Sequence, residues 1–211
     1  MIRWDWIPRN INQLTDGLVD HVVLTVIAVV IGLIISIGLS LAIYRWRGLF
    51  APITGVAGIL YTIPSLALFG LLTPWTGLSR TTAVIGLVTY TLLILTRNIV
   101  IGLDGVAPEV REAAAGMGFG PARRLFRIEL PLALPVILAG IRVAVVTTIG
   151  LVTVTAYIGQ GGLGRLILDG LTRDFRTPLV VGALLSVALA VVADVGLAAL
   201  QRRLTPWGRD Q

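Results

Sequence analysis

Five long stretches of the sequence contain almost no charged side chains, and they restrict the possible folds more than any other feature. They cover approximately residues 22–44, 51–75, 81–103, 131–158 and 177–200. A helix that crosses the hydrocarbon core of a bilayer needs roughly 20 apolar residues, at a rise of about 1.5 Å per residue. Only 13% of the residues are charged, against about a quarter in soluble domains. The sequence therefore predicts an integral membrane protein.

The predicted architecture is all-α, with about five transmembrane helices in a single domain that covers residues 1–211. The first stretch is expected to be a retained span, because the apolar core of a secretory signal is only about 7–15 residues long. Pro64 lies inside the second stretch, where proline kinks a helix. Arg97 and Asn98 lie inside the third stretch. These three residues are candidates for a structural or pathway role.

The distribution of arginine predicts the orientation. If the loop between the third and fourth stretches is cytoplasmic, ten arginines lie on the inner side and six on the outer side, where five aspartates accompany them. Cytoplasmic loops of membrane proteins are enriched in arginine and lysine. We therefore expect a multi-pass protein with its N-terminus outside and its C-terminus in the cytoplasm.

The loop itself, EAAAGMGFGPARRLFRIELP at residues 112–131, contains three arginines, two glutamates and three glycines. Pro108 suits the first position of a helix, and Glu112 places negative charge near its N-terminal end. Gly118 can end that helix, and a second helix is expected from Pro121. Two helices joined by a glycine-rich elbow suit docking against a partner protein. The alternative is an amphipathic loop that lies on anionic lipid headgroups.

The same loop resembles the signature of the permease subunits of binding-protein-dependent ABC importers. That signature reads E-A-A, three residues, G, nine residues, I-x-L-P. Every fixed position is matched, by Glu112, Ala113, Ala114, Gly118, Ile128, Leu130 and Pro131. The resemblance implies a methionine-importer-like type I permease fold. It also implies that residues 106–130 form the cytoplasmic coupling segment, which seats in a cleft of the ATPase and transmits its closure to the spans.

The resemblance implies the partners as well. They are two ATP-binding subunits, a second permease that is identical or homologous, an external substrate-binding protein and the lipid of the cell membrane. ATP and magnesium would be bound by the ATPase, because this chain lacks a phosphate-binding glycine loop that ends in Lys-Ser/Thr. We expect a non-catalytic subunit with no cofactor and no metal. Nucleic acid is not an expected partner, despite the net charge of +6.

Further stretches resemble the permeases of osmoprotectant importers, which carry glycine betaine, choline, carnitine or proline betaine. These are YTIPSLALFGLL at 61–72, TRNIVIGLDGV at 96–106, LPLALPVILAGIR at 130–142 and IGQGGLG at 158–164. The last stretch is also similar to methionine-type importers, so a permease for methionine-like amino acids is the alternative. A secondary transporter is a more remote alternative, because buried acids and two inverted halves are expected in that class.

Two charged residues lie inside the predicted spans. Arg142 lies about 16 Å from the start of the fourth span at helical rise, and Asp194 lies in the fifth span. A charge at this depth normally faces a partner or a cavity. We expect the two to pair, with Asp104 as the other possible partner. The pair would either fix helix packing or contribute to the translocation pathway.

The outer side offers weaker candidates. Gly159, Gly161, Gly162 and Gly164 are expected to form a flexible turn or an external gate. His21 is expected to lie at the membrane interface. Aromatic rings attract quaternary ammonium groups, and the candidates for that contact are Tyr61, Trp75, Tyr90 and Tyr157.

Overall fold

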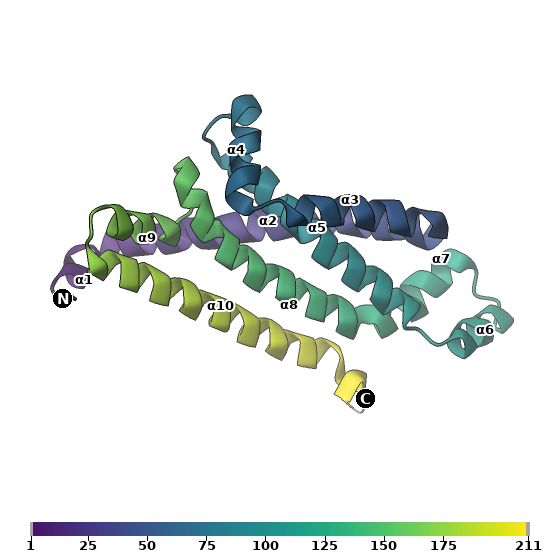
Figure 1. The fold of residues 1–211 in the computed structure, drawn as a ribbon. Coiled ribbons are helices and arrows are strands. Elements are labelled where there is room, and N and C mark those ends of the chain that lie inside the picture. The colour runs from purple at the N-terminus through teal and green to yellow at the C-terminus, as the bar shows by residue number, and fades with distance from the viewer. Residues whose placement is uncertain (1, 210–211) are drawn as a thin grey trace.

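The computed structural model describes residues 2–209, and helices make up nearly all of that range. The bundle is elongated. The N-terminus, α1 and α9 lie at one end, and α6 and α7 lie at the other (Figure 1). The helices are α1 (Trp6–Arg9), α2 (Ile11–Arg45), α3 (Phe50–Thr62), α4 (Ser65–Thr76), α5 (Arg80–Asp104), α6 (Pro108–Gly116), α7 (Pro121–Arg124), α8 (Leu130–Val154), α9 (Leu163–Thr172) and α10 (Arg176–Leu204). Short helical turns are η1 (Arg47–Leu49), η2 (Leu125–Glu129), η3 (Thr155–Ile158) and η4 (Pro206–Arg209).

The described part of the chain contains four helical stretches that are long and apolar enough to cross a membrane. They are Ile11–Arg45, Arg80–Asp104, Pro121–Ile158 and Arg176–Leu204. The bent pair α3 and α4 adds a fifth crossing if it is counted as one span. The prediction of an all-α membrane protein with about five spans is confirmed.

The second predicted span is broken at Pro64 far more sharply than by the kink that the sequence predicts. α3 and α4 meet at an angle of 98°, and neither is longer than about 20 Å at helical rise. Pro64 causes the break, because proline lacks an N–H and pushes the preceding residue out of the helical region. Ile63 is accordingly extended, with φ −65° and ψ 127°. The hydroxyl of Tyr90 donates a hydrogen bond to the carbonyl of Ile63.

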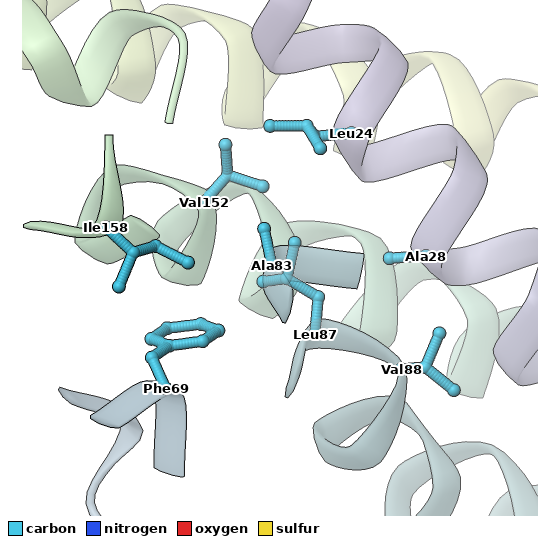
Figure 2. Packing of buried hydrophobic residues seen from close by; sticks show 8 residues of the cluster. All are labelled: Leu24, Ala28, Phe69, Ala83, Leu87, Val88, Val152 and Ile158. Carbon is cyan, nitrogen blue, oxygen red and sulfur yellow. The ribbon is translucent and has the colours of Figure 1, made fainter. Parts of the chain in front are cut away.

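The aromatic ring of Phe69 holds α4 against the bundle. Its side chain is fully buried and lies over Gly86 of α5, where a Cβ atom would come within 2.4 Å of the ring. Glycine at this position therefore allows α4 to pack closely. The surrounding cluster joins α2, α4, α5, α8 and η3 (Figure 2). Its members are Leu24, Ala28, Phe69, Ala83, Leu87, Val88, Val152 and Ile158.

The long helices differ in how much of their surface the chain covers. Half of the apolar window of α5 is buried, because α5 packs between α2 and α8. Only 11% of the corresponding window of α10 is buried. Its exposed apolar side chains include Leu184, Val187 and Val191. α5 is therefore the central helix of the bundle, and α10 leaves a large apolar surface uncovered.

Two helical segments were not predicted, namely the N-terminal turns of α2 and the short helix α9. α2 begins at Ile11, well before residue 22, and buries Leu14 and His21 in its additional turns. α9 follows the glycine-rich turn and packs against α2 and α10. Its apolar residues Leu163 and Leu166 are buried with Leu14. These segments are amphipathic, so a search for long charge-free runs does not detect them.

Candidate functional site

The elbow between α6 and α7 is built as its sequence predicts. Pro108 occupies the first turn of α6, and Glu109 lies beside it near the positive end of the helix dipole. Beyond the last turn, Gly118 adopts φ +82°. The amide of Gly118 donates to the carbonyl of Ala115 at 2.9 Å, and the amide of Phe119 donates to that of Ala114 at 3.1 Å. This pair of bonds ends the helix in a Schellman motif, which favours glycine.

The surface of α6 is largely open. Glu112 and Ala113 are exposed, whereas Ala114 is buried against the rest of the chain. The apolar side chains of Val110 and Met117 are 37% and 68% exposed. An exposed apolar surface next to a charged residue is typical of an interaction site. The exposed surface of the elbow therefore consists of alanine, methionine and a carboxylate, and it is accessible to a partner at this end of the bundle.

The remaining signature residues form the joint between the elbow and the bundle. Ile128 lies in η2, and Leu130 and Pro131 begin α8; all three are half-buried. η2 is a π-helical turn, closed by a hydrogen bond from the amide of Leu130 to the carbonyl of Leu125. Proline at 131 cannot donate and would clash with the carbonyl four residues earlier in a regular α-helix. The wider π-helical turn of η2 makes room for the proline ring.

Sequence reasoning missed the most buried charge of this region, Glu129. Its side chain is 0% exposed. It accepts hydrogen bonds from the hydroxyl of Tyr44 at 2.9 Å and from Nε of Arg124 at 2.7 Å. Nε of Arg111 lies 3.5 Å from its second oxygen. In the sequence Glu129 occupies the free position of I-x-L-P, and its only signal is an acid directly before a span and close to several arginines.

A second ion pair lies on the surface of the same end. Arg47 of η1 donates Nη1 to Asp104 at 2.9 Å, and Nη2 contacts the other carboxylate oxygen. Both side chains are about half exposed. Asp104, the other acid that the sequence offered as a partner for Arg142, therefore pairs with Arg47 instead.

The expected pairing of Arg142 and Asp194 is present. Nε and Nη2 of Arg142 each donate to one carboxylate oxygen of Asp194 at 3.0 Å. Arg142 also donates to Gln201, whose amide donates in turn to the carbonyl of Pro135. This network joins α8 to α10. Arg142 and Asp194 line a pocket of about 580 Å³ together with small side chains such as Ala139 and Ala190.

The two polar residues inside α5 have different surroundings. Asn98 donates to the carbonyl of Ile94 in its own helix at 2.8 Å. Its side chain lies against Gly140 of α8, where a Cβ atom would be 2.3 Å away. Asn98 is therefore part of the contact between α5 and α8. Arg97 is exposed and lies on another face of α5.

The glycine-rich turn on the opposite end is close-packed, in contrast to the flexible turn that the sequence suggested. Gly159, Gly161 and Gly162 have positive φ angles. A Cβ atom on Gly162 would lie 2.5 Å from the carbonyl oxygen of Gly17, and one on Gly164 would lie 2.3 Å from that of Thr153. Glycine is needed here because the turn packs directly against neighbouring backbone. A role as an external gate stays a prediction.

His21 is buried inside the bundle, and its expected depth at the membrane interface stays a prediction. Its side chain is 0% exposed, and Nε2 lies 2.9 Å from the carbonyl oxygen of Ile149. This contact joins α2 to α8. α2 begins before its apolar run, and its turns around His21 are covered by α8 and the glycine-rich turn.

The aromatic candidates do not form one cluster. Tyr61 and Tyr90 are in edge-to-face contact, with ring centroids 5.8 Å apart, next to the break at Pro64. Trp75 and Tyr157 are 79% and 56% exposed, on α4 and η3. Only the tyrosine pair is brought together.

Comparison with known proteins agrees with this geometry. Residues 34–206 match the family described as binding-protein-dependent transport system inner membrane component. The chain is 41% identical to the osmoprotectant import permease protein OsmW of Salmonella typhimurium, over 94% of this chain and 95% of the relative. It is 34% identical to the choline transport system permease protein OpuBB of Bacillus subtilis, over 96% and 94% of the two chains. A solved structure of the inward-facing MetNI methionine ABC transporter has a similar fold, with a TM-score of 0.82, 18% identity and coverage of 93% of this chain and 98% of that chain.

Proposed function

The chain belongs to the family of binding-protein-dependent transport system inner membrane components, and we propose that it carries osmoprotectants such as glycine betaine, choline and carnitine. It is the permease subunit of an ABC importer and is not itself an enzyme. ATP is bound and hydrolysed by a separate ATPase subunit. The solute class rests on relatives that span nearly the whole chain and are named for osmoprotectant and choline transport.

The observation that carries this function is the open surface of α6. An exposed carboxylate at Glu112, the methyl group of Ala113 and the uncovered side chain of Met117 form a narrow surface at one end of the bundle. Small side chains let a helix backbone enter a groove closely, and the carboxylate gives the contact an electrostatic register. In this proposal α6 seats in a cleft of the ATPase and moves with it.

This seating is tested by replacing Glu112 with arginine in a complex reconstituted in proteoliposomes. We expect ATP hydrolysis to lose its stimulation by solute and uptake to fall, while the permease still inserts and purifies. Glu109→Arg is the matched control, since Glu109 is one turn earlier on the same helix and outside the signature. Normal coupled uptake in the Glu112→Arg complex would contradict the seating.

The complete transporter requires a second permease in this proposal. The least buried span, α10, and the half-exposed pair Arg142 and Asp194 lie on one side of the molecule. Charged groups that face hydrocarbon are costly, so they normally face a water-filled cavity or protein. A second permease, identical or homologous, would cover this side and enclose the pathway. The remaining partners are two ATPase subunits and an external binding protein.

The proposed orientation places α6 and α7 in the cytoplasm. The N-terminus lies at the opposite end of the bundle from these helices (Figure 1). Together with the excess of arginine on the α6 side, this arrangement supports an external N-terminus and a cytoplasmic C-terminus. A cysteine introduced at exposed Met117 should react with membrane-impermeant maleimide only after the cytoplasmic side is opened. Labelling of intact cells would show that the orientation is the opposite of the proposed one.

A pathway role for Arg142 and Asp194 is part of the proposal. Arg142 lies midway along α8 and Asp194 in the C-terminal half of α10, and both border the 580 Å³ pocket. Uptake should fall in Arg142→Asp and in Asp194→Arg, and should recover in the double variant if the pair only fixes packing. If the pair also guides the solute, the double variant should assemble normally but import zwitterionic betaine more slowly than cationic choline.

The solute and the energy source are tested by one uptake experiment. Proteoliposomes that contain the permease, its ATPase and its binding protein should import radiolabelled glycine betaine or choline only when ATP is supplied. Import of methionine with no import of quaternary amines would favour the methionine-type alternative. Import that continues without ATP and stops when an ion gradient is removed would indicate a secondary transporter.

A further inference from the structure

The buried carboxylate of Glu129 joins three helical segments at the end of the bundle that carries α6. Through one oxygen it accepts hydrogen bonds from Tyr44, in the last turn of α2, and from Arg124 of α7. Its second oxygen faces Arg111 of α6. A buried ion is expensive to maintain unless its partners satisfy it. Apolar residues in place of the whole charged cluster would often be no less stable, so stability alone does not explain the charge.

Arg111 connects the same carboxylate to α5. Its Nη2 donates to the carbonyl of Leu103 in the last turn of α5, which also accepts from the amide of Val106 at 3.2 Å. Arg111 belongs to α6, whose outer surface is open. Any displacement of α6 relative to the bundle must therefore change the position of this guanidinium between Leu103 and Glu129.

The contact between Arg111 and Glu129 is only partly formed. Nε of Arg111 and Oε2 of Glu129 are 3.5 Å apart, and both atoms are buried without a hydrogen-bond partner among the described residues. The bond from Arg124 to Oε1, in contrast, is complete at 2.7 Å. A buried donor and a buried acceptor left unpaired cost free energy that a shift of a few tenths of an ångström would recover.

The π-helical turn η2 presents Glu129 to these partners. Glu129 is the last residue of η2, directly before α8. Pi-helical turns often occur at functional sites, since they change the direction in which side chains project. The carboxylate thus lies at the joint through which a movement of the elbow must pass to reach α8.

We propose that Glu129 is a positioning residue that couples α6 to the membrane helices. When α6 is displaced by its partner, the contact between Arg111 and Glu129 closes, and the carboxylate, held at the same time by Tyr44 and Arg124, moves α2 and α8 with it. The proposal rests on the seating of α6 on the ATPase described above. The new element is Glu129, the charged residue through which a displacement of α6 reaches the membrane helices.

The experiment measures solute imported per ATP hydrolysed in proteoliposomes that contain the whole transporter. Glu129→Gln keeps the shape of the side chain and an oxygen for Tyr44 and Arg124, but its amide nitrogen cannot accept from Arg111. We expect the ratio to fall about five-fold or more, the lower range of typical coupling energies, with ATP hydrolysis retained. The control is Asp104→Asn, which removes the ion pair with Arg47 at the same end and should leave the ratio unchanged.

A second variant keeps the proposal testable if Glu129→Gln does not assemble. Arg111→Gln leaves the buried carboxylate bound by Tyr44 and Arg124, and should lower the same ratio. A wild-type ratio in either assembled variant would overturn the proposal. If the Glu112→Arg complex loses coupling while the Glu129→Gln complex retains it, only the role of Glu129 fails. If both retain it, the seating of α6 fails as well.

Discussion

At the end of the bundle that carries the N-terminus, Gly164 lies against the backbone of α8, whereas at the other end Gly118 has no atom within 4 Å of its Cβ position. The first end is closed by backbone packed on backbone, as at Gly162 and Gly17. The second end combines an apolar cluster around Leu103 and Leu125 with the buried charge of Glu129, and it leaves α6 largely exposed. Close packing resists displacement, because interiors tolerate little change in volume.

The difference indicates which end of the bundle can move. Long side chains can rotate and exchange partners, so a segment that they hold can be displaced without losing all its contacts. Backbone-to-backbone contacts at glycine allow no such exchange. We infer that the end around Gly164 is the fixed part of the permease and that the end around α6 is the part on which a partner can act. Substitutions at glycines of the two ends test this inference directly.

The largest effect is expected for Gly164→Ala. Gly164 is helical and needs no unusual φ, so only the space around it matters. A Cβ atom there would be 2.3 Å from the carbonyl oxygen of Thr153 and 2.6 Å from its Cα. Because backbone must shift, we expect a loss of about 3 kcal/mol or more in the free energy of unfolding. Thermal denaturation of the purified permease in detergent measures this loss, and a stability within error of the parent would show that this end is not closely packed.

A smaller effect is expected for Gly118→Ala. The space around Gly118 is open, but its φ of +82° is unfavourable for any residue with a Cβ atom. Left-handed backbone costs about 1–2 kcal/mol, and the lower entropy of unfolded alanine returns part of that cost. We expect a net loss of roughly 1 kcal/mol in the same assay. Gly118→Asn should lose less, since asparagine tolerates this conformation.

The sequence could predict those features of the fold that depend on residues close together in the chain. The elbow was predictable because Pro108, Gly118 and Pro121 act on their own turns of helix. The spans were predictable because each depends on its own apolar length. The 98° break was not, since Pro64 predicts only a kink. Its size depends on Phe69 lying over Gly86, a contact between separate helices.

Some contacts of the candidate site could likewise be predicted from the sequence, and others could not. The pairing of Arg142 with Asp194 could be expected because few partners exist for a charge inside a span. Glu129 could not, because its burial depends on Tyr44, 85 residues earlier in the chain. Nothing next to Glu129 in the sequence indicates that contact. Residues that link distant elements are those that a pattern search along one chain is least able to find.

The smallest effect of the three substitutions, and a gain, is expected for Gly116→Ala. Gly116 is the last residue of α6, with open space around it and an ordinary helical backbone. Alanine is the better helix former by about 1 kcal/mol in a helix interior, and at a terminal position we expect roughly half of that as increased stability. Gly150→Ala, in the interior of α8 with equally open space, is the control in a helix that the elbow does not include, and it should also gain stability, by up to about 1 kcal/mol. A loss of stability at Gly116 alone would mean that α6 is packed more tightly than its exposure indicates. The contrast between the two ends would then fail, because both would be closed by packing.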